Sequence, residues 1–161
     1  MTISRFSTSA LRAARLTLPA AAALLAAAGF AGHALAADAD AVVGTWMVKA
    51  SDAPFQYHMF VFSADGTMQQ ANPDAGDENT SDSDGKGIWA RKDGKVIGKF
   101  VEFTADRTTH KLASRGEISY EIAVDGDTLS GTASANFYDE NDKLLRGPFP
   151  TPLQGKRVTL P

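Results

Sequence analysis

The chain has 161 residues, no cysteine and a formal net charge of −3, and its length fits a single domain of ordinary size. Without cysteine there is no disulfide, thiol nucleophile or cysteine metal site, so the fold depends on its apolar core. The acidic balance argues against nucleic acid or an anionic membrane as a partner, because both are bound through clustered Lys and Arg.

Residues 1–36 have the ordered features of a secretory signal peptide. Arginines without any acidic residue precede an apolar run over residues 16–30, and a small-X-small cleavage site ends at Ala36. The run is short for a membrane span and Pro19 interrupts it. We therefore expect cleavage near Ala36, a mature domain over residues 37–161, a periplasmic or secreted location, and no membrane insertion after cleavage.

Beyond this leader the apolar residues mostly recur with a period of two, and turn signals separate short segments. Tight turns are expected at Asp65-Gly66, Asp93-Gly94 and Asp125-Gly126, because Gly tolerates the positive φ that such turns require. The acidic stretch 74–85 lacks large apolar residues and is expected to be a loop. The pattern predicts strands over residues 42–50, 55–63, 67–71, 86–91, 95–104, 114–124, 128–138, 143–146 and 154–160.

Strands in this number and order predict an all-β fold, namely a single up-and-down antiparallel β-barrel of about eight strands. A closed barrel leaves no exposed sheet edge. A sandwich with Greek-key crossings is the alternative. Three prolines within residues 147–152 argue against a central strand there, because proline lacks the N–H group that a sheet ladder needs.

Charged residues indicate which faces of the strands lie inside. If Lys99 points outward, Glu102 points into the barrel. In residues 114–124, one interpretation leaves Arg115 and Glu117 in water, and the other lets them line a cavity. Both faces of the strand over 55–63 are apolar, so the proline-rich segment, the acidic loop or a second subunit is expected to cover its outer face. A homodimer would provide the last of these covers.

The motif Gly44-Thr45-Trp46 on a first strand, ahead of a meander of strands, resembles the lipocalin-like (calycin-type) barrels. Exported bacterial proteins with such barrels look closer than true lipocalins, as do small cyclase-type barrels such as allene oxide cyclase and dirigent proteins. The resemblance implies that Trp46 closes one end of the barrel and that a late arginine packs across its ring. Arg157 is the first candidate for that arginine, and Arg146 is the second. It also implies an internal cavity for a small apolar molecule, while a clear C-terminal helix and a disulfide are missing.

The residues that could serve such a cavity are polar or aromatic side chains on predicted strands. An inward Glu102 needs a partner or a raised pKa, which would make it a usable general acid or base, and His58 is the second candidate base. The first hypothesis is an exported barrel that binds a small hydrophobic molecule; the alternatives are an isomerase, cyclase or lyase acting by proton transfer, and a structural module. No metal or cofactor is expected. The candidate ligand-binding residues are Tyr57, His58, Trp89, Glu102, Arg115 and Tyr120.

Overall fold

The structure is a computed structural model that describes residues 40–74 and 78–161. The expected signal peptide lies outside the described residues. Within them there is no helix of the length and apolar character needed to cross a membrane.

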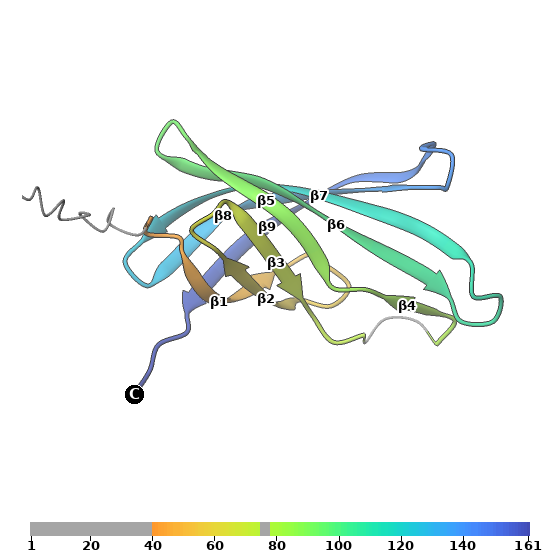
Figure 1. The fold of residues 1–161 in the computed structure, drawn as a ribbon, viewed down its shortest axis with the longest axis horizontal. Coiled ribbons are helices and arrows are strands. Elements are labelled where there is room, and N and C mark those ends of the chain that lie inside the picture. The colour runs from red at the N-terminus through yellow and green to blue at the C-terminus, as the bar shows by residue number, and fades with distance from the viewer. Residues whose placement is uncertain (1–39, 75–77) are drawn as a thin grey trace, which may run out of the picture. The chain divides into compact units, whose positions relative to one another are not determined.

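The described residues form nine strands, and two of them, β4 and the full length of β9, were not expected as such. Figure 1 shows that β6 to β9 are long and that β1 to β3 are short. The bounds are β1 Gly44–Ala50, β2 Tyr57–Phe62, β3 Thr67–Ala71, β4 Thr80–Asp82, β5 Gly85–Lys92, β6 Lys95–Asp106, β7 Leu112–Asp125, β8 Thr128–Tyr138 and β9 Leu144–Arg157.

Eight of these strands form a closed, antiparallel, up-and-down barrel, as the sequence predicts. The order β6-β5-β3-β2-β1-β9-β8-β7 is closed by pairing of β6 with β7, and β4 is an additional strand on β6. The alternative sandwich is therefore wrong. The three expected Asp-Gly turns are also present, with Gly66, Gly94 and Gly126 all at positive φ.

The proline-rich segment corrects one expectation, because it belongs to the continuous strand β9. Pairing of β9 with β1 extends only from Arg157 to Leu153, whereas its pairing with β8 continues to Leu144. The carbonyl of Pro152 accepts a hydrogen bond from Ser51 N–H, so the polar main-chain atoms of Pro152 point away from β8. Beyond the end of β1 that side of the strand faces no ladder partner, and a missing N–H group costs no ladder bond there.

The two faces of the strands separate largely as the charged residues predict. Lys99 points outward and pairs with Glu117 at 2.6 Å, while Glu102 on the same strand points inward. The barrel interior contains the apolar core, whose largest fully buried side chains include Trp46, Phe62, Met68, Ile122 and Leu153. The alternation of inside and outside positions is clearest along β7, where buried residues recur at every second position from Ser114 to Ile122.

The outer face of β2 is not covered by any described residue, which corrects part of the expectation. Tyr57 is 63% exposed, and Met59 and its cross-strand partner Met47 are 38% and 54% exposed. The proline-rich segment cannot be the cover, because it pairs with β8 instead. A second subunit stays a prediction for this face.

Candidate functional site

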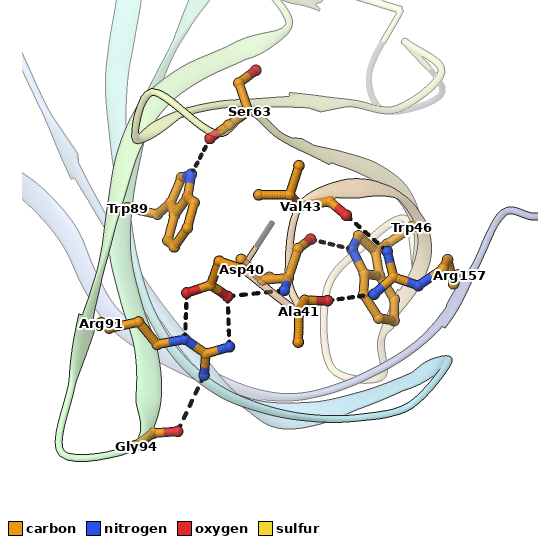
Figure 2. Close-up of polar contacts among 10 residues, drawn as sticks. Asp40, Ala41, Val43, Trp46, Ser63, Trp89, Arg91, Gly94 and Arg157 are labelled. Carbon is orange, nitrogen blue, oxygen red and sulfur yellow. Dashed lines mark hydrogen bonds and ion pairs between the residues drawn. The ribbon is translucent and has the colours of Figure 1, made fainter. Parts of the chain in front are cut away.

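One end of the barrel is closed by Trp46, as the motif indicates (Figure 2). The Trp46 side chain is fully buried and its Nε1–H donates to the carbonyl of Val42 at 2.8 Å. The guanidinium carbon of Arg157 lies 4.2 Å from the centre of the indole ring, in a cation–π arrangement. Arg157 also donates hydrogen bonds to the carbonyls of Val43 and Ala41. These bonds hold the segment that precedes β1 across this end of the barrel.

A second set of hydrogen bonds holds the segment before β1 at the same end of the barrel (Figure 2). Asp40 accepts two hydrogen bonds from Arg91, at 2.8 Å from Nε and 2.6 Å from Nη2. The Arg91 hydrogen bonds hold the pKa of the Asp40 carboxyl below its usual value. Trp89, the neighbour of Arg91 along β5, donates from its indole N–H to the carbonyl of Ser63 at 2.9 Å. This end is therefore a structural closure rather than an opening.

A layer of aromatic rings crosses the middle of the barrel. Phe60 lies 5.9 Å from Phe100 and 6.1 Å from both Phe62 and Tyr120, measured between ring centres. Edge-to-face and tilted contacts at these distances stabilise an aromatic cluster beyond the burial of its area. The layer separates the Trp46 end from the rest of the interior, because Phe60 and Phe100 also form the wall of the space beyond it.

Beyond the aromatic layer the barrel encloses a cavity of about 290 Å³. Most of its wall is apolar, with contributions from the barrel strands and from the loop between β1 and β2. Its polar side chains are few and come mainly from β2, β3, β4 and β6: His58, Gln70, Asn72, Asp82, Glu102 and Thr151, the last of these from β9. A concave, largely apolar space with a few convergent polar groups is the usual form of a small-molecule site.

A chain of hydrogen bonds fixes the orientation of the Gln70 and His58 side chains. The main-chain N–H of Gly85 donates to Gln70 Oε1 at 3.0 Å, which sets the orientation of this buried amide. Gln70 Nε2 must then be the donor to His58 Nδ1 at 3.0 Å and to Asn72 Oδ1. Because Nδ1 accepts, the neutral imidazole carries its proton on Nε2.

His58 is held neutral by its surroundings. Burial lowers the pKa of the imidazole, with a smaller opposing contribution from the main chain at Phe55. Its Nε2 atom is buried and has no hydrogen-bond partner among the residues that the structure describes. A buried donor without a partner is costly, so it marks a place where a ligand atom would improve the structure.

Glu102 is the group in the cavity whose pKa is most suited to proton transfer. Burial raises its pKa to about 7, and the charge of Asp82 adds to the effect. Asp82 accepts a hydrogen bond from the buried Thr104 hydroxyl at 2.7 Å, whereas Glu102 forms no hydrogen bond or ion pair with any described residue. Of the two carboxyl groups in the cavity, Asp82 is therefore held by a hydrogen bond and Glu102 is not, and no Lys or Arg of the described part of the chain lines the cavity.

The structure brings two of the six predicted site residues, His58 and Glu102, to the cavity. Tyr57 points outward, and Trp89 lies with the structural closure at the Trp46 end. Tyr120 belongs to the aromatic layer, where burial raises its pKa and its hydroxyl lies 3.4 Å from the carbonyl of Ile88. It therefore does not extend into the cavity.

Arg115 is the fourth of the predicted residues that lie away from the cavity. It is on the outer face of β7, paired with Asp142 at 2.6 Å and with Glu117 at 3.1 Å. Its two neighbours along the strand, Ser114 and Gly116, are buried and occupy inward positions, so Arg115 has to point outward. The interpretation that placed Arg115 and Glu117 in water is the one that the geometry supports.

Sequence reasoning missed Gln70, Asn72 and Asp82. Gln70 lies two residues after Met68 on a predicted strand, so the two side chains share a face. The period of two could therefore have identified its inward position. Asp82 gave no signal, because it lies in the acidic stretch that looked like a loop and only its pairing with Thr104 brings it over the barrel. Asn72 directly follows β3, lines the cavity and accepts a hydrogen bond from Gln70.

Metal ligands are not grouped in the part of the chain that the structure describes, where no set of three or more His, Asp or Glu side chains could hold an ion. No protein family, no curated protein and no solved structure matches the chain. The protein is therefore classified by its fold alone. It is a small closed antiparallel β-barrel with one additional strand, consistent with a lipocalin-like architecture.

Proposed function

We propose that this protein is an exported barrel of the lipocalin-like (calycin) type that binds a small, mainly apolar molecule in its interior. The observation that carries the proposal is the cavity of about 290 Å³ beyond the aromatic layer, with an apolar wall and its polar groups on a few strands. The fully buried Trp46 and its partner Arg157 close the opposite end, so we expect a ligand to enter from the end that contains the cavity.

The volume limits the size of the molecule. At roughly 30 Å³ for each water-sized group, the space holds about ten non-hydrogen atoms. Apolar transfer contributes about 0.8 kcal/mol for each buried CH₂ group, so a chain of six carbons gains enough to bind measurably. A ligand of this size fits the volume of the cavity and would pack against Phe60, Phe100 and Ile118.

Titration calorimetry of the purified protein with hexan-1-ol tests this proposal. We expect saturable binding of one molecule per chain. The substitution Ala135→Leu, which fills the cavity from β8, should remove the binding, whereas Ser134→Leu on the outer face of the same strand should not. Binding that is absent, or that is equal in the wild type and in Ala135→Leu, would contradict the proposal.

A second candidate function, catalysis by proton transfer in the same cavity, is favoured by one observation. Glu102 has a pKa near 7, which is the range in which a carboxyl group can both donate and accept a proton under physiological conditions. His58, neutral and on the same cavity wall, would be the second catalytic group. Loss of turnover in Glu102→Gln, with ligand affinity retained, would identify an enzyme; retained turnover would exclude this role.

The exported location is part of the proposal and has its own test. The order of basic, apolar and small residues in 1–36 supports it. The mass of the chain recovered from a periplasmic extract should correspond to cleavage near Ala36. Recovery of the full-length chain from the cytoplasmic fraction alone would contradict export.

A further inference from the structure

The polar wall of the cavity has an uneven distribution of charge. Within residues 40–74 and 78–161, its titratable side chains are His58, Asp82 and Glu102, and no Lys or Arg lines the space. His58 adds no positive charge, because Gln70 donates to its Nδ1 atom and burial disfavours the imidazolium. Among the residues that the structure describes, the charges that line the cavity are therefore negative.

Basic side chains on neighbouring elements are occupied elsewhere. Lys99 and Arg115 lie on the outer face and pair with Glu117. Arg146, on β9, stacks over the ring of Phe137 at 4.2 Å and is not a lining residue. None of these cations neutralises the carboxyl groups of the cavity, and Glu102 has no ion-pair partner among the residues that the structure describes. A buried carboxyl group in this position is favoured in its neutral form unless a ligand brings a positive charge to it.

We propose that the cavity is a site for a small primary amine, whose ammonium group contacts Glu102 and Asp82 and whose short apolar tail packs against Phe100 and Ile118. The inference rests on the proposed binding function and specifies its ligand class. An ammonium group restores the interactions that Glu102 loses on burial, and it remains charged up to about pH 10, as a lysine side chain does. A fatty acid or another carboxylate is disfavoured, because it would bring a like charge to the same wall.

The buried Nε2–H of His58 is an independent sign that this wall is incomplete without a ligand. As a donor, it fits an oxygen atom on the ligand rather than the ammonium group. Amines that also carry a hydroxyl or carbonyl oxygen near the charged end are thus the members of the class that match both groups.

Binding of the amine requires Glu102 to be ionised, so a protonated Glu102 releases its proton to solvent as the ammonium enters. Among the described residues, the other titratable groups that line the cavity are Asp82 on β4 and His58 on β2, and of these the charge of Asp82 acts on Glu102. The residue paired with Glu102 on β7 is Gly116, which carries no side chain. Affinity for an amine should consequently rise with pH while affinity for an alcohol stays constant.

Three probes of equal chain length test the ligand class: hexylamine, hexan-1-ol and hexanoate, titrated into the purified protein at about pH 8 and about pH 5.5. We expect hexylamine to bind about tenfold more tightly than hexan-1-ol at the higher pH, and hexanoate to bind most weakly. At the lower pH hexylamine should lose about tenfold in affinity. Glu102→Gln should remove the advantage of the amine and its pH dependence, with hexan-1-ol binding retained.

Glu117→Gln is the matched control, because Glu117 is a carboxylate on the outer face of the barrel. This variant should bind all three probes as the wild type does. The inference is overturned if hexan-1-ol or hexanoate binds as tightly as hexylamine, or if Glu102→Gln leaves amine binding unchanged. Those outcomes leave the apolar binding function standing, whereas failure of all three probes to bind would overturn both.

Discussion

Gln70 Nε2 lies 3.0 Å from His58 Nδ1, and this contact determines that the imidazole presents its other nitrogen as a donor. The orientation of Gln70 is itself set by the main chain of Gly85. A strand-to-strand hydrogen bond between β3 and β5 thus fixes the protonation site of a side chain on β2. The cavity is therefore lined by a neutral imidazole at His58 and by a carboxyl group with a raised pKa at Glu102.

The first prediction concerns this tautomer. His58 should remain neutral with its proton on Nε2 at pH values at which an exposed histidine is already charged, because burial lowers its pKa below 6.5. Long-range ¹H–¹⁵N correlation spectra of the imidazole, recorded against pH, measure both the tautomer and the pKa. Gln70→Met removes the donor and should shift the population toward the other tautomer. A wild-type His58 that titrates above 6.5 would contradict the account.

A second prediction concerns stability against pH. The folded state raises the pKa of Glu102 from 4.5 to about 7, so the folded protein binds more protons than the unfolded chain between these values. Stability contributed by this group is therefore intact below about pH 4.5 and decreases as pH rises to about 7, by roughly 2–3 kcal/mol in the free energy of unfolding. His58 acts in the opposite direction as pH falls below 6.5.

Urea unfolding of the wild type and of Glu102→Gln at several pH values separates the two groups. The variant lacks the carboxyl group, so it should match or exceed the wild type at about pH 8 and lose that advantage near pH 4.5. Parallel stability curves for the two proteins would show that Glu102 has an ordinary pKa.

A third prediction concerns the closure at the Trp46 end. Arg157→Ala removes the cation over the indole ring and the hydrogen bonds to the carbonyls of Val43 and Ala41. We expect a loss of about 1–3 kcal/mol in the free energy of unfolding. Lys156→Ala, at an exposed position next to it, should change stability by less than about 0.5 kcal/mol. Equal effects of the two substitutions would argue against a structural role for the cation.

A fourth prediction compares two glycines of the barrel. A Cβ atom at Gly116 would lie 2.9 Å from Glu102 Cγ, on a flexible side chain, whereas one at Gly87 would lie 2.1 Å from the carbonyl oxygen of Lys99. Gly116→Ala should therefore fold and displace Glu102, which weakens hexylamine binding. Gly87→Ala should cost about 1–3 kcal/mol or more in stability, because main chain cannot give way as a side chain can. Thermal unfolding and calorimetry measure the two effects, and normal hexylamine affinity in Gly116→Ala would count against the placement of Glu102.

The sequence predicted the barrel well because the period of two and the Asp-Gly turns are local signals. The inward position of Glu102 also followed from a local fact, the outward preference of Lys99 three residues earlier on the same strand. Arg157 over Trp46 could be expected from the resemblance of the first-strand motif alone. These features depend on the residues of one or two neighbouring segments.

The features that sequence reasoning missed depend on distant pairing. Asp82 reaches the cavity only because β4 pairs with β6, and nothing in the acidic stretch indicates that pairing. The three prolines within residues 147–152 argue against a central strand in the sequence, although one side of β9 has no partner beyond β1 and tolerates them. Trp89 is a candidate ligand-binding residue in the sequence because of its residue type. Its position along β5 places it at the closed end of the barrel, near Trp46.

Native mass spectrometry of the protein isolated from a periplasmic extract tests the central claim, that the cavity is a binding site, most directly. The account predicts a mature chain carrying a small copurified molecule, released on gentle activation, and predicts that Ala135→Leu, which fills the cavity, is recovered at its bare mass. Recovery of the wild-type protein only at its bare mass, together with no binding of hexylamine or hexan-1-ol, would contradict it.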